Sequence, residues 1–105
     1  MLENTVLIAE KNTHEYLLQN SDAVYLTKAD LDSLTREEYC LARNEIYAQH
    51  VRIFATPQIR DYFESKIWYS GTINGADFDV TVGTYFNMIE LANISFISQY
   101  EQQQC

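Results

Sequence analysis

The middle of the chain alternates apolar and polar positions with a helical period, between clear start signals. Thr27 opens a first run of one or two turns. Thr35, with Glu38 three residues later, forms the capping-box pattern in which each side chain satisfies a backbone donor at a helix start. Apolar positions then recur every three or four residues, which predicts a helix over residues 36–50.

A second helix start lies at Thr56, which is followed by Pro57. Proline suits the first helical position because it lacks the backbone donor that this position does not use. The pattern predicts that this helix ends near Ser65. The segment that follows contains Gly71 and the pair Asn74–Gly75, so we expect it to be the main loop.

The last element begins near Asp79 or Thr81 and is predicted to be one long helix that ends near Gln102. Its apolar stripe advances in helical steps, and a polar residue, Asn93, fills a gap in it. The stripe consists of Val82, Phe86, Ile89, Phe96 and Tyr100.

The elements together predict a mainly α, small single-domain fold of short helices with one long C-terminal helix. Residues 1–20 are expected to be an extended or irregular N-terminal segment, because short β-prone runs and turn residues mix there. Residues 21–102 form the helical domain, and residues 103–105 are expected to fray.

Composition limits the partners of this domain. The 105 residues are 47% hydrophobic and 13% aromatic, which suits one folded domain. The net charge is −8, and no Lys or Arg follows Lys66. Nucleic acids and anionic membrane surfaces are therefore disfavoured, since both are bound mainly through basic side chains. Cationic ligands, sugars and neutral peptides remain open.

The cysteines and histidines are scattered through the sequence. Cys40, Cys105, His14 and His50 lack the spacing of metal ligands, so we expect no metal and no cofactor. They also do not indicate a disulfide framework, and Cys40 is expected to be a small buried hydrophobe. No run approaches the ~20 apolar residues of a membrane span, so no membrane insertion is expected in this segment.

The predicted central helix contains many polar side chains for a helix that is contacted on most sides. One interpretation is an internal polar network that fixes how the helices meet, because a buried charge without a partner is costly. In that network Glu45 or Glu90 accepts from Arg43. Asn44 and Asn93 would bridge backbone groups at helix ends.

The other interpretation is a ligand site. Its candidate residues are Tyr47, His50, Trp68 and Tyr69. Trp68 and Tyr69 open the Gly/Asn loop, where aromatic faces can stack on sugar rings or on proline. The alternative for Trp68 is that it packs in the core. The alternative for His50 is a local hydrogen bond at the end of a helix, without a ligand.

Four stretches of the sequence, taken in order, resemble the YARHG domain family. They are "SDAVYLTKADLDSLTREEYCLARNEIYAQH", "RIF", "IRDYFESKIWY" and "FNMIELANISFISQYE". The resemblance implies a small bacterial extracytoplasmic domain, attached to peptidases or kinases or carried by membrane-anchored proteins. It implies no catalytic residue, because the molecular function of the family is not established.

The chain departs from the family's naming motif at two positions. Gln49 stands where the family has Arg, which removes a contact for anions. Val51 stands where the family has Gly, a residue suited to a left-handed helix cap. Because a β-branched residue is strained at positive φ, we expect either that the helix continues through Val51 or that it ends without this cap.

The main hypothesis is a non-catalytic, extracytoplasmic accessory domain of a bacterial cell-envelope protein. It would bind a cell-wall component or a protein partner in a shallow groove that includes Tyr47, Trp68 or Tyr69. One alternative is a purely structural spacer or dimerisation module. Another is a small hydrolase that uses Glu45, His50 and Glu90. The sequence does not fix the oligomeric state.

Overall fold

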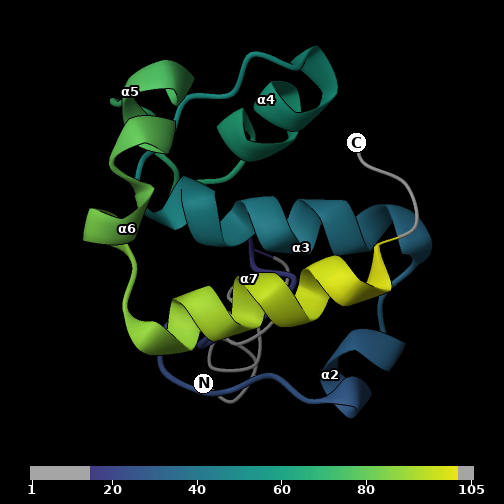
Figure 1. The fold of residues 1–105 in the computed structure, drawn as a ribbon. Coiled ribbons are helices and arrows are strands. Elements are labelled where there is room, and N and C mark those ends of the chain that lie inside the picture. The colour runs from purple at the N-terminus through teal and green to yellow at the C-terminus, as the bar shows by residue number, and fades with distance from the viewer. Residues whose placement is uncertain (1–14, 102–105) are drawn as a thin grey trace, which may run out of the picture.

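The computed structural model describes residues 15–101, except for the side chains of residues 82 and 83. Predictions for residues 1–14 and 103–105 therefore lie outside the described residues. The predicted mainly α fold is confirmed (Figure 1). The helices are α2 (Lys28–Asp32), α3 (Arg36–Gln49), α4 (Pro57–Glu64), α5 (Gly75–Val80), α6 (Val82–Tyr85) and α7 (Met88–Tyr100).

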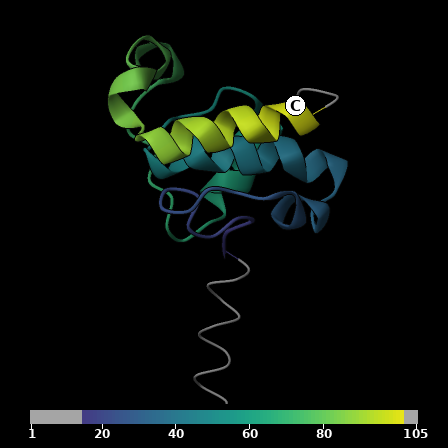
Figure 2. The same ribbon diagram turned by 60° about the horizontal axis from the view of Figure 1, so that its bottom comes forward.

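Helices α3 and α7 lie side by side and form the centre of the molecule (Figures 1 and 2). Ile46 of α3 and Ile97 of α7 are fully buried between them. Leu31 of α2 and Phe78 of α5 belong to the same main core, where burial of apolar surface stabilises the fold. A second core, around Phe63, lies between α3 and α4.

The helix starts occur where the sequence predicts them. Thr27 and Thr35 each cap a helix with a reciprocal capping box, formed with Asp30 and Glu38. Pro57 occupies the first position of α4, although the side chain of its N-cap residue makes no capping hydrogen bond. These signals are local in the chain, and for that reason the sequence alone is enough to place them.

The long C-terminal helix is α7, but it begins later than expected. The segment after Asp79 is divided, because Thr81 leaves the helical conformation and Phe86 is extended. Asn87 then starts α7 with its own capping box, in which its side chain accepts from the Glu90 N–H and the Glu90 carboxylate accepts from the Asn87 N–H. The apolar stripe therefore runs across two helices, α6 and α7, and the break between them.

Helix α3 ends in a way that neither sequence-based alternative describes. Val51 adopts a left-handed conformation with φ of 64° in spite of its branched side chain. Its N–H donates to the Ala48 carbonyl at 2.9 Å, and the Arg52 N–H points to the Tyr47 carbonyl at 3.5 Å, which is the Schellman pattern. The Val51 carbonyl accepts from the N–H groups of residues 72 and 73, so the main loop holds the strained residue in place.

We expect Val51→Gly to raise the free energy of unfolding by about 1 kcal/mol. Glycine removes the strain of the left-handed conformation, and this gain exceeds its entropic cost in the unfolded chain. Urea denaturation followed by circular dichroism would measure the change. Val51→Ala is the control, because alanine also shortens the side chain but keeps the Cβ that causes the strain. A glycine variant no more stable than the alanine variant would contradict the prediction.

Candidate functional site

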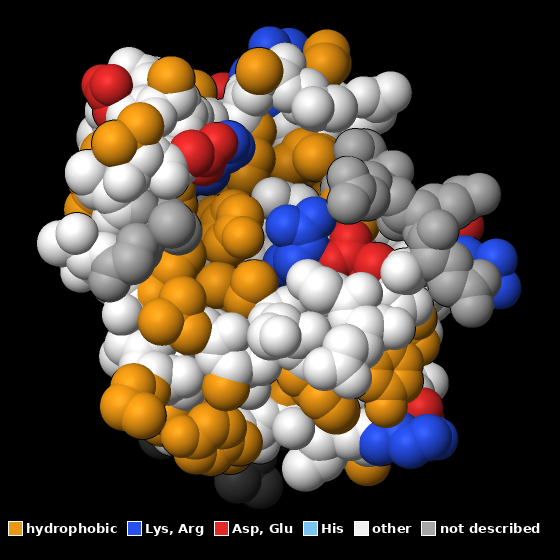
Figure 3. Space-filling model, viewed as in Figure 1, with side chains coloured by type: hydrophobic (Ala, Val, Ile, Leu, Met, Phe, Trp, Pro, Cys, Tyr) orange, Lys and Arg blue, Asp and Glu red, His pale blue; other side chains and the backbone are white. Residues whose placement is uncertain are grey.

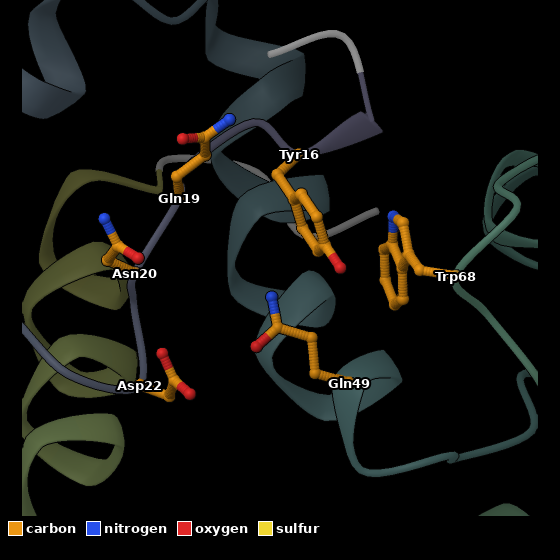
Figure 4. A pocket seen from close by; sticks show the side chains of 6 residues that line it. All are labelled: Tyr16, Gln19, Asn20, Asp22, Gln49 and Trp68. Atoms are coloured by element: carbon orange, nitrogen blue, oxygen red, sulfur yellow. The ribbon is translucent and has the colours of Figure 1, made fainter. Parts of the chain in front are cut away.

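A pocket of about 490 Å³ opens between the N-terminal segment, the end of α3 and the start of the main loop (Figure 4). We call it the N-terminal pocket. Its lining residues come from three places that are far apart in the sequence, so only the folded domain brings them together. They are Tyr16, Gln19, Asn20, Asp22, Gln49 and Trp68.

The aromatic side of the N-terminal pocket is a stacked pair of rings. Tyr16 and Trp68 lie with their ring centroids 4.9 Å apart and their planes 15° from parallel. The Trp68 indole N–H donates to the Glu15 carbonyl at 2.8 Å, and the Glu15 carboxylate accepts from the Ile67 N–H at 2.8 Å. These bonds fix the indole, so the aromatic side is formed before any ligand arrives.

The polar side of the pocket consists of three amides and one carboxylate. Gln19, Asn20, Asp22 and Gln49 contribute these side chains, and none of them makes a side-chain hydrogen bond within residues 15–101. The backbone beneath them is ordered by a turn: Asn20 has φ of 63°, and its carbonyl accepts from two N–H groups further along the turn. The pocket therefore presents donors and acceptors that the rest of the described chain does not use.

Glu45 of α3 holds the wall of the pocket from inside. Its side chain is fully buried, and its two carboxylate oxygens accept from the Leu17 N–H at 2.8 Å and the Leu18 N–H at 3.1 Å. Burial raises the pKa of Glu45 to about 7, although the two N–H groups and the charge of Lys66 act to lower it. Glu45 is thus an anchor for the segment that carries Tyr16, and it does not line the pocket.

Asn93 of α7 holds the next part of the same wall. Its amide oxygen accepts from the Leu26 N–H at 2.9 Å, and its amide nitrogen donates to the carbonyls of Ser21 at 2.8 Å and Val24 at 3.0 Å. Only 1% of Asn93 is exposed. One buried side chain therefore satisfies three backbone groups of a segment that has no secondary structure of its own.

His50 and Glu90 form a pair between the end of α3 and the start of α7. The His50 Nε2 lies 2.7 Å from a Glu90 carboxylate oxygen, and the imidazole packs edge-on against Phe86. Glu90 is 2% exposed and also belongs to the capping box of α7. The pair joins the end of α3 to the start of α7, and it is separate from the residues that line the N-terminal pocket.

A second hollow, which we call the arginine groove, is lined by Arg43, Asn44, Tyr47, Arg52 and Asp79 and has a volume of about 380 Å³. Glu101 accepts from Arg43, so the acceptor is neither Glu45 nor Glu90. Arg52 pairs with Asp79 at 3.1 Å. Figure 3 shows a basic and an acidic side chain in contact at the centre and at the upper left of this face. Both guanidinium groups thus already have carboxylate partners.

Comparison of the chain with models of protein families gives a match. The family model of the YARHG domain matches residues 14–102, which is most of the chain. The chain belongs to the YARHG domain family. This is a small extracytoplasmic family of unestablished function. No curated protein and no solved structure matches the chain.

The four ligand-binding candidates of this YARHG domain do not gather at one place. Trp68 lines the N-terminal pocket and Tyr47 lines the arginine groove. His50 pairs with Glu90, and the Tyr69 hydroxyl donates to the Arg52 carbonyl. The hollow that Trp68 lines and the one that Tyr47 lines are therefore separate, and the binding role of these residues stays a prediction.

The proposed network residues of the YARHG domain mostly bind backbone rather than one another. Asn44 donates from its amide nitrogen to the Cys40 carbonyl at 3.0 Å, within α3. Glu45 and Asn93 fasten the N-terminal segment, whereas Arg43 and Glu90 form ion pairs. They act as separate anchors and form no single connected cluster.

Four lining residues of the pocket are not among the residues that the sequence singles out: Tyr16, Gln19, Asn20 and Asp22. Three of them lie in the turn-rich stretch after Leu18, where polar residues indicated only a loop. No sequence pattern marks these residues, because the wall that they form is held by bonds from Glu45 and Asn93 to backbone groups. No group of His, Cys, Asp or Glu within residues 15–101 is placed to hold a metal ion, and no helix there is long and apolar enough to cross a membrane.

Cys40 corrects one expectation about this YARHG domain. The residue is buried, as expected, but it is disulfide-bonded, although the sequence indicated no disulfide framework. Two cysteines 65 positions apart give no recognisable pattern, so the sequence could not reveal this bond. Disulfides persist mainly in oxidising compartments, which agrees with an extracytoplasmic family.

We expect the purified, unreduced chain to have no reactive thiol. The chain has two cysteines, and Cys105 is the partner that we expect for Cys40. Alkylation in denaturant, followed by mass spectrometry, should label neither cysteine before reduction and both after it. Labelling of Cys40 without a reductant would contradict the prediction.

Proposed function

We propose that this YARHG domain is a non-catalytic accessory domain of a bacterial cell-envelope protein and that it binds a small polar ligand in the N-terminal pocket. The observation that carries the proposal is the pocket itself: a fixed aromatic pair beside four polar side chains that the fold does not use. Aromatic surface with a few convergent polar groups is typical of sites for sugars and similar ligands. A cell-wall component is the ligand class that fits best.

The hydrolase alternative loses support from the placement of its residues. Glu45 and Glu90 are both buried, and each is bound by groups of the fold. Two carboxylates that act on a substrate must converge on a cleft that the substrate can enter. Here Glu45 faces the N-terminal segment, while Glu90 faces His50 and the start of α7.

The spacer alternative rests on a different observation. Most motif side chains hold backbone segments together, so a folding role explains them without any ligand. That role does not explain the polar lining of the N-terminal pocket. A direct binding experiment on the pocket therefore separates the two proposals.

The test uses Trp68, which is the only tryptophan of the chain and lies in the pocket wall. We expect its fluorescence to change on titration with muropeptides or with glycan fragments of the cell wall. Gln49→Ala should weaken this response about tenfold, since it removes a hydrogen-bonding side chain. Gln58→Ala, on the exposed surface of α4, is the matched control and should leave the response unchanged.

The outcome that overturns the proposal is also clear. If neither the fluorescence of Trp68 nor the amide chemical shifts of residues 16–22 respond to any of these ligands, the pocket is not a binding site for them. An unchanged affinity in Gln49→Ala would show that the ligand binds at another site.

A further inference from the structure

We propose that the N-terminal pocket selects ligands that carry an ammonium group and that Asp22 is the specificity-determining residue. The proposal rests on the proposed function, because it concerns the same pocket. It names the chemistry of the ligand: a protonated amine on a hydroxyl- or amide-rich frame, such as a de-acetylated amino sugar or the side chain of a lysine-like residue.

The charges around the pocket favour a cationic ligand. Asp22 is the one charged side chain among the six lining residues that the structure describes, and no ion pair within residues 15–101 involves its carboxylate. The whole chain carries a net charge of −8. An anionic ligand would be repelled at long range and at contact, whereas a cation is attracted at both.

Asp22 is held in a fixed position at one end of the pocket. The backbone on either side of its carboxylate is tied to α7, since the Asp22 carbonyl accepts from the Asn87 amide at 2.9 Å and the Ser21 carbonyl accepts from Asn93 at 2.8 Å. The carboxylate therefore projects from a fixed backbone, as Figure 4 shows, on the side opposite to Trp68. A ligand that spans the pocket meets a carboxylate at one end and aromatic rings at the other.

The remaining lining residues can bind the uncharged parts of such a ligand. Tyr16 and Trp68 offer π surface, which attracts cations as well as apolar faces. The amides of Gln19, Asn20 and Gln49 can bind hydroxyl, acetamido or peptide groups, and they add no positive charge. None of the lining residues within 15–101 carries a positive charge beside Asp22, so a cationic ligand would supply the counter-charge.

The experiment compares ligands that differ only in the charge of one kind of group. One pair is the glucosamine trisaccharide and its fully N-acetylated counterpart. The other is Nα-acetyl-lysine amide and the same compound acetylated at Nε. At about pH 6 the amines are protonated, and acetylation removes the charge. We expect the ammonium member of at least one pair to bind about tenfold more tightly, and the responding pair identifies a sugar or a peptide as the source.

Variants of the intact chain assign the preference to Asp22. Asp22→Asn should bring the two members of the responding pair to within about twofold of each other, because a charge-assisted contact becomes a neutral one. Asp61→Asn, on the exposed surface of α4, also removes one negative charge and should keep the tenfold preference. The Trp68 fluorescence and the amide shifts of residues 16–22 report binding in every case.

Each result decides a different proposal. Equal or tighter binding of the acetylated members would overturn the ammonium preference and leave the binding function intact. An equal loss of preference in Asp22→Asn and Asp61→Asn would assign it to overall charge and overturn the role of Asp22. The absence of any response to these four compounds, to muropeptides and to other glycan fragments would overturn the proposed function itself.

Discussion

Replacing Asn93 by alanine is expected to lower the free energy of unfolding by about 3 kcal/mol. The substitution deprives the Leu26 N–H and the carbonyls of Ser21 and Val24 of their partner. Each buried polar group that loses its partner costs on the order of 1–3 kcal/mol, and relaxation of the segment recovers part of this. Urea denaturation followed by circular dichroism measures the loss.

The control for Asn93→Ala is Gln99→Ala, an exposed position on the same helix. This variant should change stability by less than about 0.5 kcal/mol, as surface substitutions usually do. A loss below about 1 kcal/mol in Asn93→Ala would contradict the role of the amide as the anchor of residues 21–26. The variant should also weaken any ligand of the N-terminal pocket, since the same segment carries Asp22.

The second large effect is a dependence of stability on pH that comes from Glu45. Its pKa is about 7 in the folded domain and ordinary in the unfolded chain, where 4.5 is the reference. Below the unfolded pKa the carboxyl is protonated in both states, and its contribution to stability is fully present. As the pH rises from 4.5 to 7 the unfolded state gives up its proton first, so the free energy of unfolding falls by about 3 kcal/mol in total.

Glu45→Gln tests this assignment, because glutamine does not titrate. Urea denaturation between about pH 4 and pH 8 should give a slope for the parent chain that largely disappears in the variant. Glu64→Gln, at an exposed position of α4, should keep the slope of the parent. An unchanged slope in Glu45→Gln would refute the assignment.

The features that the sequence predicts correctly are local ones. A capping box needs only residues three apart, so Thr35 and Glu38 locate the start of α3 without any tertiary information. The same signal at Asn87 and Glu90 was hidden inside an apolar stripe with helical steps, and the stripe predicted one long helix where the structure has α6 and α7. Hydrophobic periodicity gives the face of a helix but not its breaks.

The features that the sequence does not predict depend on distant partners. Val51 violates a backbone preference, and only the hydrogen bonds from the main loop make its left-handed conformation acceptable. The sequence suggests Glu45 as an acceptor for Arg43. In the structure its partners are two backbone N–H groups, 27 and 28 positions earlier in the chain. Backbone donors carry no sequence signature, so this kind of pairing becomes visible only in the fold.

The wall of the N-terminal pocket has a consequence for how the domain folds. Hydrogen bonds from Asn87 and Asn93 to the segment around Asp22 join residues that are 65 to 72 positions apart. Contacts of such high sequence separation form late, because the chain between them must first be ordered. During synthesis the segment therefore emerges long before α7, the helix that fixes it. The pocket becomes complete only when the last helix has docked, so a chain shortened within α7 would lose the site together with the helix.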